Sequence, residues 1–209
     1  MSATGDRLWT GTVPLVLASK SLGRRLALEQ TGASFSIHPA EVDERAIEAR
    51  VAAEGGGPDE IAARLAREKA LAVSVQRRAA IVIGADQVAS CAGRRFGKPA
   101  DLAAAAAQLR FLSGRTHRLH SALALARDGH VLFETVAHAD LAMRPVSEDF
   151  LALYLDIVGE AATTSAGAYQ IEGLGIHLFD HVAGDHSTIL GLPLTPLLAA
   201  LRREGALLS

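Results

Sequence analysis

The chain has 209 residues, of which 49% are hydrophobic and 21% are charged, so it can bury a core and is not an intrinsically disordered protein. Its net charge of −2 at pH 7 argues against a nucleic-acid partner, because nucleic-acid surfaces usually carry a basic excess. A single cysteine excludes a disulfide framework, and the apolar runs are too short for a signal peptide or a membrane span. We therefore expect a cytoplasmic protein with no membrane partner.

Hydrophobic periodicity predicts strands and helices in alternation along the chain. Serine or aspartate caps, glycine stops and alanine-rich stretches mark the helices. In chain order, the predicted elements are a strand over 13–19, a helix over 21–32, a strand over 34–40, a helix over 58–78, a strand over 80–86, a hairpin turn near 91–99, a helix over 101–114, two hairpin strands over 117–144, a helix over 147–159, a β-rich segment over 168–194 and a helix over 195–205. Because hairpins interrupt the alternation, we expect an α/β fold with a mixed sheet, and no linker divides the chain into domains.

The stretch "SKSLGRR", residues 19–25, is the first candidate site, because hydroxyls and arginines follow a strand and open a helix. Helix N-terminal N–H groups and guanidinium groups bind anions, so phosphate is the natural ligand of Ser21 and Arg24. The alternative is a capping serine in a solvated basic turn. The stretch is not a P-loop, since G-x-x-x-x-G-K-[ST] is missing.

Two groups of carboxylates are further candidates. Asp86 ends a buried strand, where an unpaired carboxylate is costly, so it is either a turn residue or holds a ligand. Residues 40–45, "AEVDER", include Glu41, Asp43 and Glu44, which could supply oxygen ligands to Mg²⁺ or form an ordinary solvated acidic loop. Lys69 and Lys98 are each typical of a surface lysine, but with Arg24 they could neutralise a triphosphate.

Eight short motifs follow one another in order from about Leu15 to Leu194. They read "LASKSLGRR", "EVDER", "RLAREKA", "IGADQV", "FGKP", "LSGRTHRLHSALAL", "AGAYQIEGLGI" and "GLPL". In this order they resemble the Maf family of nucleoside triphosphate pyrophosphatases. The resemblance implies an elongated mixed sheet flanked by helices, of the inosine-triphosphate-pyrophosphatase type, in a single domain over residues 1–209 with a core over about 13–205. It also implies a homodimer.

The activity that the resemblance implies is hydrolysis of a nucleoside triphosphate to the monophosphate and pyrophosphate, with Mg²⁺ or Mn²⁺, to remove noncanonical nucleotides. The implied residues, matched by position, are Asp86, Glu44, Lys69 and Lys98 for catalysis, Asp86 and Glu44 for the metal, and Ser21 and Arg24 for the phosphates. Asp86 matches the family's proton acceptor. The sequence leaves open which of the two carboxylates takes the proton and which holds the metal.

Three positions of the family face the base, and they fall here at Gly23, Gln87 and Glu172. "GADQV" and "IEG" resemble the branch that hydrolyses 7-methyl-GTP, although Gly23 departs from the aromatic residue often found there. A carboxylate at Glu172 could accept both N–H donors of guanine's Watson–Crick edge, and it would repel pyrimidine carbonyl groups. The alternatives are a dTTP/UTP or broad-specificity pyrophosphatase, and a non-catalytic nucleotide-binding regulator of cell division.

Overall fold

The computed structural model describes residues 8–208, which form two compact units. Unit 1 comprises the described residues up to Gln87, residues 121–137 and residues 185–208, and unit 2 comprises residues 88–120 and 138–184. Three strands contribute residues to both units: β3 (Ile81–Cys91), β5 (Thr116–Arg127) and β6 (His130–Met143). The prediction that the chain is one domain stays a prediction.

Unit 1 contains five strands in the order β2 (Phe35–Ile37), β1 (Leu15–Leu17), β3, β5 and β6 among its described residues. β1 pairs in parallel with both β2 and β3. The helices of this unit are α1 (Leu22–Glu29), α2 (Glu44–Ala53), α3 (Pro58–Ser74), α6 (His186–Ile189) and α7 (Leu194–Arg203). β3 and β6 also have antiparallel partners in unit 2, so the predicted α/β class with a mixed sheet is confirmed.

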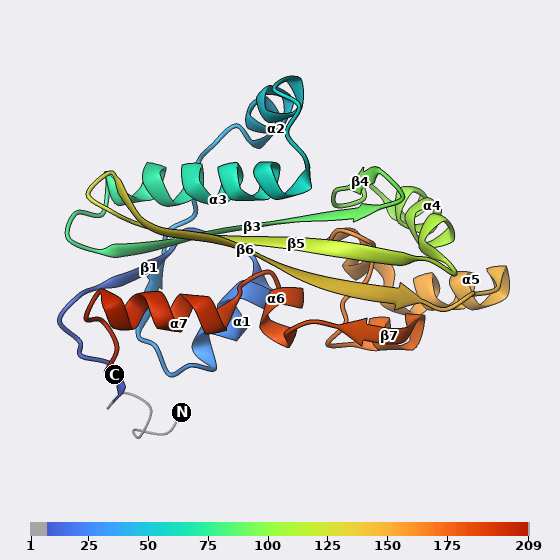
Figure 1. Ribbon diagram of the computed structural model, residues 1–209. Coiled ribbons are helices and arrows are strands. Elements are labelled where there is room, and N and C mark those ends of the chain that lie inside the picture. The colour runs from blue at the N-terminus through green and yellow to red at the C-terminus, as the bar shows by residue number, and fades with distance from the viewer. Residues whose placement is uncertain (1–7, 209) are drawn as a thin grey trace. The chain divides into compact units, whose positions relative to one another are not determined.

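In unit 1, the strands β1, β3 and β5 are buried on both faces, and alternate residues of β3 point to opposite faces. Ile81 and Ile83 pack in the core cluster that includes residues of α1 and α7, whereas Val82 packs in a second cluster with Val73 of α3. In Figure 1, α3 lies on one side of these strands, and α1 and α7 lie on the other. The same alternation places Asp86 on the α3 face of the strand and Gln87 on the opposite face.

Unit 2 contains β4 (Arg94–Phe96) and β7 (Phe179–Ala183), which pair antiparallel with β3 and β6. Its helices are α4 (Leu102–Leu112), α5 (Glu148–Val158) and the 3₁₀ helices η2 (Gly159–Thr163) and η3 (Leu174–Leu178). The side chain of Asp101 caps α4 as predicted. No helix within residues 8–208 is long and apolar enough to cross a lipid bilayer.

The prediction of a β-rich segment over residues 168–194 is wrong. The segment forms turns, η3, the short strand β7 and the helix α6. Its chain reverses at Gln170, whose carbonyl oxygen accepts hydrogen bonds from the N–H groups of Gly173 and Gly175. A Cβ atom at Gly175 would lie 2.4 Å from that oxygen, so the glycines permit a tight turn where the apolar residues alone suggested extended strands.

The acidic stretch at residues 40–45 is not a plain loop. Asp43 caps α2 by accepting a hydrogen bond from the Ala46 N–H at 3.0 Å, and Glu44 is the first residue of that helix. The cap residue and an acidic first turn are the usual signals of a helix start. They fix the direction in which the Glu44 side chain leaves the backbone.

His117 is a buried histidine in unit 2. Its Nε2 atom is 2.5 Å from the hydroxyl of Tyr169, and its Nδ1 atom has no hydrogen-bond partner among the described residues. Burial lowers the pKa of His117 to about 4, and the nearby charge of Asp140 opposes this shift only in part. The ring is therefore neutral in the folded protein at pH 7.

Because the unfolded chain binds a proton near pH 6.5 and the folded His117 does so only near pH 4, stability should fall with acidification. At about 1.4 kcal/mol per pKa unit, we expect wild type to lose about 2 kcal/mol between pH 7 and pH 5 through this residue. Urea unfolding at both pH values should show a smaller loss for His117→Gln. An equal loss in both proteins would contradict this account.

Candidate active site

Lys69 of α3 lies between two carboxylates. Its Nζ atom is 2.7 Å from Glu44 Oε1 at the start of α2 and 2.6 Å from Asp86 Oδ1 on β3. The side chains of Lys69 and Asp86 are 10% and 11% exposed, whereas that of Glu44 is 53% exposed. Buried charges are costly unless they pair, which these do. Three of the predicted catalytic residues thus form one charged cluster, and Glu44 is its solvent-facing member.

Gly84 lets α3 come close enough to β3 for this contact. A Cβ atom at Gly84 would lie 2.2 Å from the Ala66 carbonyl oxygen and 2.7 Å from the Ala70 backbone nitrogen. Gly84 also lies two residues before Asp86, on the same face of the strand. Any side chain here would push the helix and strand apart, so the glycine of "IGAD" positions the pair of Lys69 and Asp86.

Arg24 of α1 is the second cation of the site. Its Nη1 atom donates to the Ala85 carbonyl at 2.8 Å and to Ser19 Oγ at 3.3 Å, and its Nε atom donates to the Gly191 carbonyl at 3.0 Å. The paired register of β1 with β3 ends at Ile83, so the Ala85 carbonyl lies beyond it. The guanidinium supplies the hydrogen bond that a buried carbonyl needs at this point.

The electrostatics link Arg24 to the carboxylates as well. Burial lowers the pKa of Arg24, while the charges of Asp86 and Glu44 oppose that shift. A guanidinium nevertheless stays charged at any physiological pH. Arg24 and Lys69 together carry two positive charges, and Asp86 and Glu44 carry two negative ones. This group of four residues is therefore electrically balanced before any ligand binds.

Ser21 and Gly23 lie at the N-terminal end of α1. Ser21 is the cap residue, as predicted, and its Oγ atom accepts a hydrogen bond from the Arg24 N–H at 3.4 Å. A Cβ atom at Gly23 would lie 3.4 Å from the Leu190 carbonyl oxygen, which is an ordinary contact. Local packing therefore does not demand glycine at position 23, although the backbone of Leu190 closes that side of the helix end.

Gln87 faces α6 rather than α3. Its Nε2 atom donates to Ser121 Oγ at 2.8 Å, to the Ile189 carbonyl at 3.0 Å and to the Thr188 carbonyl at 3.2 Å. Ser121 lies on β5 and is fully buried. Sequence reasoning did not single out Ser121 or the α6 segment. The sequence did offer one signal for them, their position relative to the family motifs. Ser121 lies within "LSGRTHRLHSALAL", and α6 comes just before "GLPL".

The last two predicted site residues belong to unit 2. Lys98 is exposed in the loop between β4 and α4, and Glu172 is exposed in the turn before η3. Within this unit, neither residue lies in a helix or a strand. Their roles beside Lys69 and Gln87 stay predictions.

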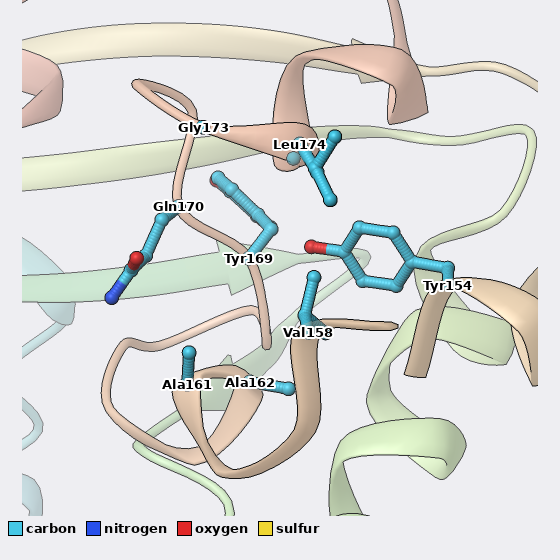
Figure 2. Close-up of a pocket in the computed structure, with 9 residues that line it drawn as sticks. Tyr154, Val158, Ala161, Ala162, Tyr169, Gln170, Gly173 and Leu174 are labelled. Atoms are coloured by element: carbon cyan, nitrogen blue, oxygen red, sulfur yellow. The ribbon is translucent and has the colours of Figure 1, made fainter. Parts of the chain in front are cut away.

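A pocket of about 150 Å³ adjoins the turn that carries Glu172 (Figure 2). Figure 2 shows the ring of Tyr154 pointing from α5 toward Tyr169 and Leu174. None of its nine lining residues is charged, and they include Val158, Ala161 and Ala162. An apolar lining of this kind does not suit a triphosphate. The pocket therefore does not compete with the charged cluster of unit 1 as the place of phosphate chemistry.

The prediction that the strand ends at Asp86 is wrong, because β3 continues to Cys91 and Asp86 lies in its middle. The group of two cations and two carboxylates, held by this strand and by α1, α2 and α3, is typical of enzymes that act on phosphate compounds. The chain belongs to the Maf family, because the model of the Maf-like protein family matches residues 14–204. It is 54% identical over 203 residues to the nucleoside triphosphate pyrophosphatase of Rhodopseudomonas palustris, covering 96% of this chain and 98% of that protein. The resemblance seen in the sequence motifs is confirmed.

Two further relatives are similar over almost their whole length. The 7-methyl-GTP pyrophosphatase of Rhizobium etli is 53% identical over 196 residues, covering 94% of this chain and 98% of that protein. The nucleoside triphosphate pyrophosphatase of Nitrobacter winogradskyi is 53% identical over 197 residues, covering 94% and 96%. The named relatives thus share one reaction type, and one of them is named for a particular base.

Proposed function

We propose that this chain hydrolyses nucleoside triphosphates to the monophosphate and pyrophosphate, prefers 7-methyl-GTP, and removes noncanonical nucleotides. The observation that carries the proposal is the convergence of Glu44 and Asp86 on Lys69, with Arg24 in the same charged group. Relatives named nucleoside triphosphate pyrophosphatase and 7-methyl-GTP pyrophosphatase support the reaction and the base. A cytoplasmic location and a homodimer belong to the same proposal.

The charge balance of the cluster supports a divalent cation. Arg24 and Lys69 only offset Glu44 and Asp86, so a polyanionic triphosphate needs further positive charge. Carboxylate oxygens are the ligands that Mg²⁺ and Mn²⁺ prefer, and those of Glu44 and Asp86 already converge on one cation, the Lys69 ammonium. These two residues would hold the metal, which, when bound, neutralises charge on the phosphate oxygens and orients water.

The chain's own groups supply the rest of the chemistry. Asp86 takes a proton from the water that attacks the α-phosphorus, and the contact with Lys69 holds this carboxylate in place. Arg24 and the end of α1 at Ser21 bind phosphate oxygens. Lys98 offsets the charge that builds up on the leaving pyrophosphate. Gln87 and Glu172 contact the base.

A panel of nucleotides tests the proposal by the release of pyrophosphate. We expect 7-methyl-GTP to have a kcat/KM at least about tenfold above those of UTP and dTTP. The exposed Glu172 carboxylate would be covered by the bound base, and an acceptor that is covered without a matching donor costs about 1–3 kcal/mol. Chelation by EDTA should abolish release, and added Mg²⁺ or Mn²⁺ should restore it. Faster turnover of UTP or dTTP would instead support the pyrimidine alternative. No release from any nucleotide, with nucleotide still bound, would support a regulator of cell division.

A further inference from the structure

The amide group of Gln87 is held in one orientation by three acceptors. Its Nε2 atom donates to the Ser121 hydroxyl and to the carbonyl oxygens of Thr188 and Ile189, at distances of 2.8–3.2 Å. The Ser121 hydroxyl in turn donates to the Thr188 carbonyl at 2.7 Å. Ser121 and Thr188 are 0% and 3% exposed, so these groups have little access to water.

The directions of these hydrogen bonds follow from the chemistry of each group. A carbonyl oxygen only accepts, and the single hydrogen of the Ser121 hydroxyl is already given to Thr188. Ser121 must therefore accept from Gln87, which requires an N–H group at that position. If the amide were flipped, its oxygen would face two carbonyl oxygens and a hydroxyl without a free hydrogen. The contacts thus fix the nitrogen inward and the Gln87 Oε1 atom outward.

The outward Oε1 atom is free to accept a hydrogen bond, since none of the described residues donates to it. We propose that Ser121 is a positioning residue that orients this acceptor toward an N–H donor of the nucleobase. The inference rests on the proposed function and deepens its account of base preference. An acceptor here favours guanine-type edges, which carry a ring N–H and an amino group, over pyrimidine edges dominated by carbonyl oxygens.

The turn that follows α6 contacts both Gln87 and Arg24, the residue proposed to bind phosphate. The Gly191 carbonyl accepts from Arg24 Nε, and a Cβ atom at Gly191 would lie 3.2 Å from that nitrogen and 3.6 Å from Gln87 Nε2. Gly191 also has a φ of +85°, which favours glycine. The backbone of one turn therefore supports both side chains, and Ser121 fixes which atom of Gln87 is presented.

The test is the ratio of kcat/KM for 7-methyl-GTP to that for UTP. Ser121→Ala removes the acceptor for Gln87 and the donor to Thr188, and it should lower this ratio about fivefold to tenfold, as expected for one oriented hydrogen bond. Ser74→Ala is the matched control. Ser74 is equally buried, donates to the Leu71 carbonyl and accepts from the Gly129 N–H, so its loss should leave the ratio within about twofold of wild type.

A double variant separates positioning from general damage. Because Ser121 acts through Gln87, adding Ser121→Ala to Gln87→Met should change the ratio no further. Gln87→Glu supplies a second test that leaves Ser121 in place. A carboxylate cannot donate to the three acceptors, so the side chain would lose the contacts that orient it. We expect this variant to lower the ratio as Ser121→Ala does. Thermal unfolding followed by circular dichroism confirms that each variant is folded.

The outcomes distinguish this inference from the proposed function. Equal loss of kcat/KM for both nucleotides in Ser121→Ala, an additive loss in the double variant, or an unchanged ratio in Gln87→Glu would overturn the role of Ser121 while hydrolysis stands. A wild-type protein that releases pyrophosphate from no nucleotide would overturn both. The inference is supported if Ser121→Ala lowers the ratio, Ser74→Ala does not, and the effect of Ser121→Ala disappears when Gln87→Met is already present.

Discussion

Asp86→Asn is expected to lower kcat for pyrophosphate release by about 10²–10⁴-fold, the usual contribution of a general base. An asparagine keeps the shape of the side chain and an oxygen that can accept from Lys69 Nζ, now 2.6 Å from Asp86 Oδ1. It cannot take a proton from water, and it is a weaker ligand for a divalent cation. Steady-state rates at saturating nucleotide and metal measure the effect, and KM should change less than kcat.

Asp128→Asn is a suitable control for this change. Asp128 lies in the turn between β5 and β6 with a φ of +51°, which asparagine also tolerates, and its Oδ1 atom accepts from the Ala79 N–H at 3.0 Å. Asparagine preserves that hydrogen bond, so wild-type kcat is expected. If Asp86→Asn also kept wild-type kcat, Asp86 would be neither the base nor an essential metal ligand.

Gly84→Ala should destabilise the fold by on the order of 3 kcal/mol, at the upper end of the usual cost of overpacking. The added Cβ atom would meet backbone atoms of Ala66 and Ala70, at 2.2 Å and 2.7 Å, and backbone cannot rotate away as a side chain can. Relief requires α3 to move from β3, which would stretch the contact between Lys69 and Asp86. We therefore expect lower activity as well as a lower urea midpoint.

Gly97→Ala provides the comparison for stability. Nothing lies within 4 Å of a Cβ atom at Gly97, and its φ is not in the left-handed region. The same chemical change there should shift the free energy of unfolding by no more than about 0.5 kcal/mol, as for other surface substitutions. Similar urea midpoints for Gly84→Ala and Gly97→Ala would contradict this prediction, because they would show that α3 can move away from β3 without loss of stability.

Much of the fold could be predicted because its signals are local. Capping side chains at Ser21 and Asp101 mark helix starts in the sequence, and the structure places hydrogen bonds there. The turn at Asp128 and Gly129 joins the two predicted hairpin strands. Each of these features depends on a few consecutive residues, whose conformational preferences act without help from the rest of the chain.

The candidate site was predicted only in part, because it depends on distances between segments far apart in the sequence. Residue types and the family resemblance pointed to Glu44, Lys69 and Asp86, but neither could show that one ammonium bridges the two carboxylates. Ser121 was missed for the same reason. A serine inside an apolar strand has no local signature, and its importance appears only when the α6 carbonyl groups stand beside it.

The two-residue period of β3 has a consequence for how proteins of this kind can change. Asp86 and Gln87 are neighbours in the chain, yet one faces α3 and the other faces α6. Under the proposed function, substitutions on the α6 side of the strand can change the preferred base without altering the hydrolytic groups on the α3 side. The same geometry forbids a one-residue insertion or deletion before Asp86, because it would exchange the two faces at once. New substrate preferences can therefore arise by point substitution in β3, whereas insertions or deletions in this strand before Asp86 would disrupt the site.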